Sequence, residues 1–142
     1  MRRIKKTTIV LTTVLLMTLS TMAVYAEEYD FAKYFSTGAS TWSTVSAAKK
    51  DWGYKYALIQ ITSGKWGENL TEFDICSAVS HTSLLQSTLK IHNTDYNPYL
   101  ALYTTDVGAA YYKDAELRAR PLGWTGTYTL HGKWSPNTIL IS

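Results

Sequence analysis

The chain has 142 residues, of which 14 are Lys or Arg and 11 are Asp or Glu. Four of the basic residues and none of the acidic ones lie in the first 26 positions, so the other 116 residues carry 10 basic and 11 acidic side chains. Their formal charge of −1 excludes nucleic acid as a partner, because such a partner requires a net basic face that displaces counterions. The only cysteine, Cys76, excludes an intramolecular disulfide, so packing must stabilise the fold.

The first 26 residues have the pattern of a secretory signal peptide. Met1–Lys6 carries four basic residues and no acid, and Thr7–Val24 is apolar apart from Thr and Ser. Small residues at the spacing that signal peptidase reads end at Ala26, and two acidic residues follow. We expect cleavage after Ala26 and a secreted, extracellular protein without a transmembrane segment. The alternative is an uncleaved anchor, because an apolar run of about 18 residues is near the lower limit for spanning a bilayer.

The remaining part, residues 27–142, has the length of one ordinary domain. It contains 18 of the 19 aromatic residues of the chain. Each aromatic side chain can bury on the order of 150–250 Å². We therefore expect a single domain whose aromatic residues replace disulfides as the source of stability.

Four segments in the first half of this domain have strand patterns. Tyr29–Phe35 and Ser40–Val45 are the weaker candidates. Tyr54–Thr62 is almost continuously apolar, which is typical of a central strand covered on both faces. Leu70–Val79 alternates apolar and acidic side chains, which predicts a half-buried strand.

Three more strands are predicted in the second half. Pro98–Tyr103 carries its proline at the first position, where a missing hydrogen-bond donor is tolerated. Glu116–Arg120 alternates charged side chains with Leu and Ala, and Thr127–Trp134 alternates polar side chains with mostly apolar ones. Several short strands at this spacing favour an antiparallel architecture.

Helical patterns are weak. Val45–Asp51 and Thr105–Glu116 contain Ala and charged residues, but neither has an apolar stripe that lasts three turns. We expect at most a single helical turn at either place. The sequence as a whole predicts an all-β protein, with one antiparallel β-sandwich after a cleaved N-terminal signal helix. A closed barrel is the alternative arrangement of the same strands.

Aromatic residues in the predicted turns are the first candidates for a binding site. They are Trp52, Trp66, Tyr96 and Trp124. Indole rings on loops can stack on sugars or enter a membrane interface. The alternative is that they fold back over the ends of the core. We select Trp52, Trp66 and Trp124 as candidate binding residues.

A stripe of charged residues is the second candidate. Glu116, Arg118 and Arg120 alternate along one predicted strand and therefore share one face. Two guanidinium groups side by side can bind phosphates or carboxylates of the cell envelope. The alternative is an ordinary solvated face. We select Arg118 and Arg120 as candidate anion-binding residues.

A thiol nucleophile would need a base, and three histidines are available for that role. Cys76 could meet His81, His92 or His131 in the folded chain. A reactive cysteine also needs an exposed and electropositive setting. A single structural thiol and surface histidines are the alternative that we favour, so no catalytic residue is assigned.

Two acids share the predicted strand face of Cys76. Glu72 and Asp74 should raise the pKa of the thiol if they lie close to it. Paired carboxylates are also used by glycosidases, but from opposite sides of the cleaved bond. We therefore interpret these two acids as a solvated surface. No spacing of His, Cys, Asp or Glu indicates a metal site, and no motif indicates a cofactor.

The layout of the chain has a family likeness. It combines the signal Met1–Ala26, a short β-rich aromatic domain without a disulfide, and the segment Gly132–Pro136 with the sequence Gly-Lys-Trp-Ser-Pro. In this layout it resembles small secreted proteins of Gram-positive bacteria. More distantly, it resembles the lactococcin-972-like bacteriocins, which are secreted β-sandwich proteins. The resemblance implies an extracellular role and a sandwich fold, and it assigns no functional residue.

Three functions remain open at this point. The first is a secreted, non-catalytic sandwich that binds an envelope glycan or a surface protein, with a bacteriocin-like role as one form of it. The second is a protein-binding or structural role, such as an inhibitor or a matrix component. The third is a secreted enzyme with an unrecognised site that uses His or Cys.

Overall fold

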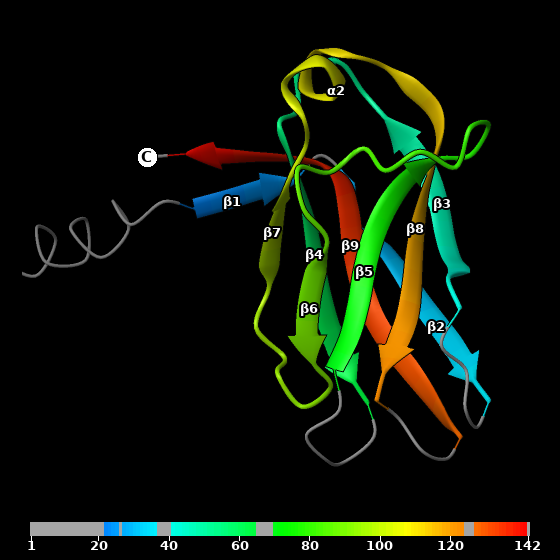
Figure 1. The fold of residues 1–142 in the computed structure, drawn as a ribbon. Coiled ribbons are helices and arrows are strands. Elements are labelled where there is room, and N and C mark those ends of the chain that lie inside the picture. The colour runs from blue at the N-terminus through cyan, green and yellow to red at the C-terminus, as the bar shows by residue number, and fades with distance from the viewer. Residues whose placement is uncertain (1–21, 26, 37–40, 65–69, 124–126, 142) are drawn as a thin grey trace, which may run out of the picture.

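The computed structural model describes residues 22–25, 27–36, 41–64, 70–123 and 127–141 (Figure 1). These residues form antiparallel strands and one short helix. The elements in chain order are β1 (Met22–Tyr25), β2 (Tyr29–Phe35), β3 (Ser43–Lys50), β4 (Tyr56–Ser63), β5 (Leu70–Ser77), β6 (Leu89–His92), β7 (Tyr99–Leu102), α2 (Thr105–Ala109), β8 (Tyr112–Leu122) and β9 (Tyr128–Ile141).

The strands form two sheets that pack face to face. One sheet has the order β1-β9-β4-β7, with β2 also paired to β9, and the other has the order β3-β8-β5-β6. All pairs between named strands are antiparallel. The predicted all-β sandwich is therefore confirmed. The barrel alternative is wrong, because the described strands stay in two separate sheets.

Strands β1 and β2 lie end to end along the same side of β9. Met22 pairs with Ile141 and Tyr25 with Thr138. Tyr29 then pairs with Trp134, so the register continues without a shift from β1 to β2. Figure 1 shows β1 and the end of β9 leaving the body of the sandwich together.

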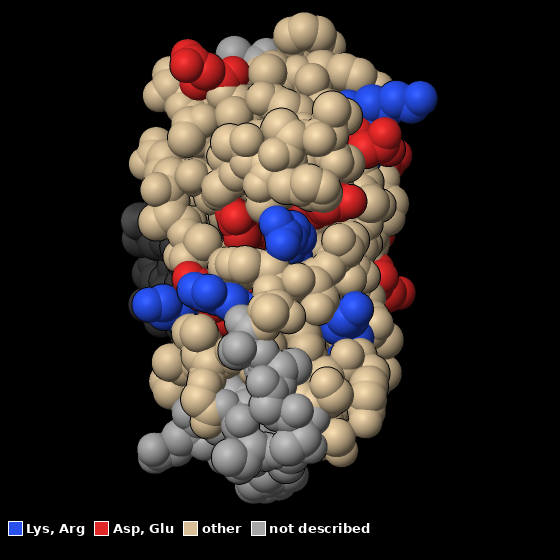
Figure 2. Space-filling model, turned by 45° about the vertical axis from the view of Figure 1, so that its right-hand side comes forward, with Lys and Arg blue, Asp and Glu red and all other residues tan. Residues whose placement is uncertain are grey.

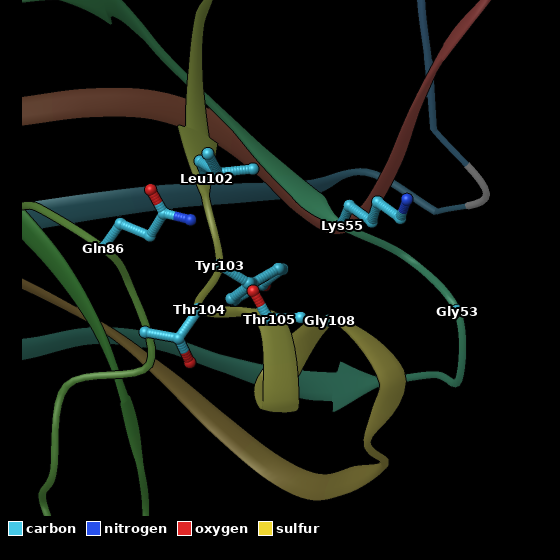
Figure 3. Close-up of a pocket in the computed structure, with 8 residues that line it drawn as sticks. All are labelled: Gly53, Lys55, Gln86, Leu102, Tyr103, Thr104, Thr105 and Gly108. Carbon is cyan, nitrogen blue, oxygen red and sulfur yellow. The ribbon is translucent and has the colours of Figure 1, made fainter.

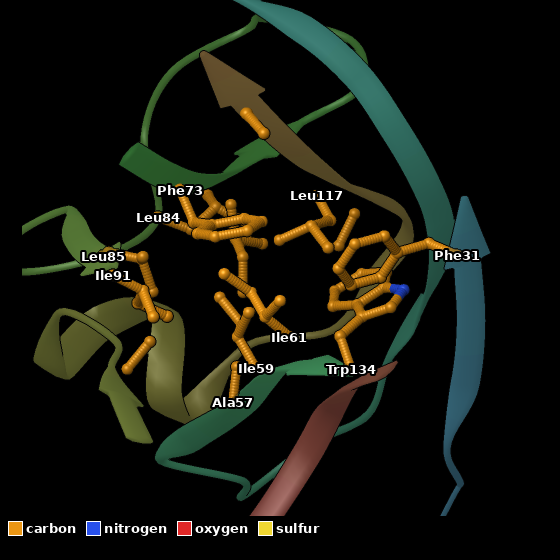
Figure 4. Close-up of a cluster of buried hydrophobic side chains, with 14 of the residues drawn as sticks. Phe31, Ala57, Ile59, Ile61, Phe73, Leu84, Leu85, Ile91, Leu117 and Trp134 are labelled. Carbon is orange, nitrogen blue, oxygen red and sulfur yellow. The ribbon is translucent and has the colours of Figure 1, made fainter. Parts of the chain in front are cut away.

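Apolar side chains from both sheets fill the space between them (Figure 4). Trp134 of β9 and Phe73 of β5 are fully buried, and Phe31 of β2 packs against Phe73 with ring centroids 6.1 Å apart. Burial of one such side chain contributes roughly 1.5–3 kcal/mol. Trp134 belongs to the Gly-Lys-Trp-Ser-Pro segment, so the tryptophan of that segment is a core residue.

Most predicted strands are confirmed with small changes of boundary. The weak candidate Tyr29–Phe35 is β2 to the residue, and the central strand predicted over Tyr54–Thr62 is β4, which lies between β9 and β7. The strand predicted over Thr127–Trp134 is longer in the structure, because β9 continues to Ile141 and pairs with β1.

The helical alternatives have different outcomes. The segment 105–109 forms the single turn of helix α2, as expected. The segment Val45–Asp51 forms no helical turn, because residues 45–50 belong to β3. Pairing with β8 overrides the local preference of Ala and Lys, and two register irregularities accommodate the pairing.

The predicted signal peptide is only partly described. Residues 1–21 and 26 lie outside the described residues, whereas Met22–Tyr25 form β1 and are not helical. The expected signal helix is thus wrong for these four residues, because their backbone pairs with β9. Among the helices in the described part of the chain, none has the length and apolar character needed to cross a membrane.

Candidate binding site at the α2 end of the sandwich

Trp52 lies in the turn after β3 and is exposed. Its relative exposure is 69%, and its ring stacks on Tyr111, which is 40% exposed. The ring centroids are 6.0 Å apart with an interplanar angle of 21°. Gly53 supports the turn with a φ of 78°, a conformation that other residues adopt only with strain. Trp52 therefore does not cover the core. It forms a two-ring platform with Tyr111 at the surface.

A pocket of about 320 Å³ lies next to this turn (Figure 3). Gly53 lines it, so the pocket and the Trp52 turn share a wall. In Figure 3 the Gln86 side chain points toward Leu102 and Tyr103, whereas the amine end of Lys55 points away from them. Its lining residues are Gly53, Lys55, Gln86, Leu102, Tyr103, Thr104, Thr105 and Gly108. Such a mixture of apolar walls and a few polar groups is typical of sites for small ligands.

Backbone hydrogen bonds between distant segments fix the shape of the pocket. The Gln86 N–H donates to the Leu102 carbonyl at 2.9 Å, and the Thr104 N–H donates to the Leu84 carbonyl at 3.1 Å. The Tyr103 N–H donates to the Lys55 carbonyl at 3.0 Å. These bonds join the β3–β4 connection, the β5–β6 connection and the end of β7. The pocket is therefore held by the backbone, independently of any ligand.

Lys50 is buried beneath this end of the sandwich. Its Nζ donates to the carbonyl oxygens of Asp51, Gly108 and Ala110 at 3.0, 3.3 and 3.0 Å. The same Nζ lies 4.9 Å from the ring centroid of Tyr103. Burial lowers the pKa of Lys50 to about 8, and nearby Asp51 opposes that shift. Lys50 thus ties the Trp52 turn to the end of α2, and its full burial keeps it away from solvent.

The stripe of arginines has partners within the protein. Arg120 Nε donates to Glu72 Oε2 at 2.5 Å, and its guanidinium lies 4.7 Å from the ring centroid of Trp42. Arg118 lies 5.8 Å from the same ring centroid, and its Nη1 is 3.8 Å from Cys76 Sγ. These contacts hold both arginines flat on the outer face of the β3-β8-β5 sheet. Figure 2 shows acidic and basic side chains intermixed on the visible face, where neither sign gathers alone.

The interpretation of Glu72 and Asp74 as a solvated surface is wrong. Their relative exposures are 5% and 8%, because the connection between β5 and β6 covers this face. Thr88 Oγ1 donates to Glu72 at 2.6 Å, and Ser83 Oγ donates to Asp74 at 2.5 Å. Burial raises the pKa of Glu72, but hydrogen bonds from Thr88 and Arg120 outweigh this effect, so its pKa is lowered.

Cys76 is buried and protonated at neutral pH. Burial is the main cause that raises its pKa to about 11, and a hydrogen bond to Asp74 Oδ2 at 3.2 Å adds to the effect. The expected influence of the neighbouring acid on the thiol pKa is confirmed. His81 Nδ1 lies 3.7 Å from Glu116 Oε2, and its side chain is largely exposed. Among the described residues, the side-chain partners of the Cys76 thiol are Asp74 and Arg118, and neither is a histidine. Among the described residues, no group of three His, Cys, Asp or Glu side chains could hold a metal ion.

The sequence-predicted binding residues do not converge on one place. Trp52 lies beside the pocket, whereas Arg118 and Arg120 lie on the outer face of the β8 strand. Trp66 and Trp124 lie outside the described residues. Sequence reasoning missed Tyr111 and the pocket. The Tyr111-Tyr112 pair offered a signal, since two adjacent aromatics at the start of a strand point to opposite faces.

Comparisons with known proteins assign no family. No protein-family model matches the chain, and no curated protein matches it in sequence. The likeness to the lactococcin-972-like bacteriocins therefore stays a prediction.

Solved structures show a distant likeness. The chain is similar to the Bacillus endospore appendages described as a novel family of disulfide-linked pili, at 9% identity and a TM-score of 0.41 over 87% of this chain and 92% of that one. It is similar to the capsid of Helicobacter pylori bacteriophage KHP30, at 11% identity and a TM-score of 0.35 over 86% and 98%. A third match is the VP2 particle of infectious bursal disease virus, at 12% identity and a TM-score of 0.44 over 85% and 32%. At these values no residue role is transferred.

Proposed function

We propose that this protein is secreted and binds a glycan of the cell envelope, without catalysis, through Trp52, Tyr111 and the pocket beside them. The observation that carries the proposal is the exposed Trp52 ring, which is held by Tyr111 and shares the Gly53 turn with the pocket. The signal-like segment Met1–Ala26 supports a site of action outside the cell.

The chemistry of the platform suits a sugar. An indole ring offers a flat apolar face that covers the CH groups of a sugar ring, and its rim reaches water. Stacking on Tyr111 fixes the ring before any ligand arrives, so little side-chain entropy is lost on binding. The open face of Trp52 then serves as the contact surface.

The pocket supplies groups that can bind hydroxyls. Gln86 offers both a donor and an acceptor, and Thr104 and Thr105 offer hydroxyl groups. A volume of about 320 Å³ is at the small end of ligand pockets and fits one sugar unit better than a long chain. In this arrangement one unit occupies the pocket while the next one lies on Trp52.

A catalytic role has less support. The Cys76 thiol is buried and its pKa is raised to about 11, which disfavours the thiolate that a nucleophile needs. The side chain of His81 is exposed and faces Glu116. The arginines Arg118 and Arg120 are engaged with Trp42 and with acidic or thiol partners, so we place them outside the proposed site.

The test is binding of the purified protein to cell-wall glycan from Gram-positive cells, measured by co-sedimentation over a range of glycan concentrations. Trp52→Ala should weaken binding at least tenfold, because a central aromatic contact carries a large share of the binding energy. Gln86→Ala should weaken it less. Circular dichroism and the melting temperature of each variant check that the fold is intact.

Tyr34→Ala is the matched control. Tyr34 is also an exposed aromatic, with a relative exposure of 61%, but it lies on β2 and lines no part of the pocket. Its removal should leave glycan binding unchanged. Equal binding by wild type and Trp52→Ala would contradict the proposal. So would equal losses in the Trp52 and Tyr34 variants, since that result indicates general adhesion of aromatic surface.

A further inference from the structure

The position of β1 has a consequence for the secreted form of the chain. β1 and β2 continue one register along β9, and the predicted cleavage after Ala26 falls between them. Cleavage would leave β2 on the first half of β9 and remove β1 from the second half. The backbone of Thr138–Ile141 would then lose its pairing partner on that side. We call this four-residue segment the β9 tail.

The β9 tail has few other backbone partners among the described strands. On its opposite side, pairing with β4 reaches only Thr138, which faces Tyr56. For residues 139–141 the described strands include no second partner. Ile139 is already 40% exposed with β1 in place. The tail carries no charge and no proline, and such residues are the usual protection of a free strand edge.

We propose that removal of the first 26 residues opens the β9 tail for antiparallel pairing with the β9 tail of a second copy of this chain. The inference rests on the secretion and cleavage that belong to the proposed function. It adds a homodimeric state that glycan binding does not require.

A second copy fits this edge for three reasons. First, β1 shows that the edge accepts an uncharged, antiparallel strand of four residues, and Thr138–Ile141 is itself such a strand. Second, an antiparallel pair of identical strands is related by a two-fold axis, so both edges are satisfied at once. Third, the β9 tail extends away from the sandwich in Figure 1, so the two bodies are separated.

The same geometry sets the register and the strength of the contact. A two-fold axis perpendicular to the sheet places a residue opposite its own copy, so Ile139 or Leu140 must lie at the centre. Charge does not oppose the contact, because residues 27–142 have a formal charge of only −1. In either register three residues of each tail have a partner in the other tail, and so few bury less than the roughly 1,000 Å² of a stable interface. The dimer should therefore be weak and depend on concentration.

Dimerisation would also double the proposed glycan site. The Asn137 side chain accepts from the Asp51 N–H at 2.7 Å, directly before Trp52, and Asn137 directly precedes the β9 tail. Asn137 thus connects the two, because its side chain binds the backbone next to Trp52 and its own backbone continues into the β9 tail. A dimer joined at the tails would present two sites, which raises apparent affinity for a repeating glycan.

The experiment uses the full chain expressed in a secreting Gram-positive host. Mass spectrometry of the protein from the medium identifies its first residue, and sedimentation velocity from 1 µM to about 1 mM measures association. We expect a chain that begins at Glu27 and a dimer fraction that increases with concentration. A synthetic peptide with the sequence of Met22–Tyr25, flanked by lysines for solubility, should refill the edge and return the protein to monomer. A scrambled peptide should not.

Two variants locate the interface. Ile139→Lys should weaken dimerisation at least tenfold, because it places a charge on the paired edge. Leu100→Lys is the matched control, since Leu100 is similarly exposed but lies on β7 at the other edge of the same sheet. If Ile139→Lys fails to fold, the peptide competition still tests the edge.

Either of two results would overturn the inference. One is a processed chain that stays monomeric throughout the concentration range. The other is a secreted chain that retains residues 22–25, because β1 would then still occupy the edge. Neither result bears on glycan binding, which is tested separately by co-sedimentation of the Trp52→Ala variant.

Discussion

The ring of Phe31 occupies the space directly over Gly132, its register partner on β9. A Cβ atom at position 132 would overlap with this ring and with the carbonyl oxygen of Gln60 on β4. Because residue 132 is glycine, the Phe31 ring can lie over the β9 backbone and contact Phe73 in the other sheet. The glycine of the Gly-Lys-Trp-Ser-Pro segment is therefore required by packing.

Gly132→Ala should destabilise the protein by about 1–3 kcal/mol, which is the usual cost of overpacking a core. Chemical denaturation followed by tryptophan fluorescence measures this change. Gly108→Ala is the control, because a Cβ there would meet Lys55 Cγ at an ordinary 3.6 Å. An unchanged midpoint for Gly132→Ala would show that the Phe31 ring is free to move away.

The sequence predicts the strands well because alternation is a local property. Residues two apart share a face, so the polar and apolar sides of Thr127–Trp134 are visible without knowledge of the partner strands. The short strand β6 was missed, since Leu89–His92 has too few residues to establish a period. The full extent of β3 over residues 45–50 was not visible in the sequence, because its pairing with β8 is a contact between distant parts of the chain.

The candidate site was harder to predict than the fold. Trp52 is recognisable as an aromatic residue beside a glycine in a turn. The pocket is not recognisable, because its walls come from segments near Gly53, Gln86, Leu102 and Gly108 that meet only in the folded chain. The buried state of Glu72 was invisible for the same reason, since the connection between β5 and β6 covers it.

Lys50 should make stability depend on pH in the alkaline range. Its pKa is about 8 in the folded protein, against an ordinary value of 10.5. Between these two values the unfolded chain binds more protons than the folded one, so the free energy of unfolding increases with pH. The shift corresponds to a gain on the order of 3 kcal/mol across this range.

Lys50→Met isolates this effect, because it lacks the titrating amine. The free energy of unfolding of the wild type should increase relative to that of the variant as the pH increases from 8 to 10.5. Urea denaturation at several pH values measures it, and the difference cancels the titration of the tyrosines. A difference that stays constant with pH would contradict the lowered pKa.

Arg120 should stabilise the protein mainly through Glu72. Arg120→Met removes the main cation beside a buried carboxylate and should destabilise the fold by roughly 2–3 kcal/mol. The variant should also unfold at a higher pH during acid titration. The folded-state pKa of Glu72, lowered in the wild type, increases without the guanidinium, so stability is lost earlier as the pH falls.

The double variant Glu72→Gln/Arg120→Met tests whether the two effects are coupled. It should recover part of the stability lost in Arg120→Met, because no unpaired charge remains buried. Independent losses that simply add would show that Arg120 acts through its contact with Trp42 instead.

Cys76 should be inert in the folded protein. The thiol is buried, its relative exposure is 1%, and its pKa is raised to about 11. Iodoacetamide at pH 8 should therefore modify Cys76 only as fast as the protein unfolds, whereas the unfolded chain in urea reacts at the rate of a free thiol. Rapid alkylation of the native protein would contradict the buried, protonated thiol.

Replacement of Cys76, His81, His92 and His131 together should leave glycan binding unchanged, provided that the variant keeps its fold. Loss of glycan binding in the folded quadruple variant would show that Cys76 or a histidine belongs to the site.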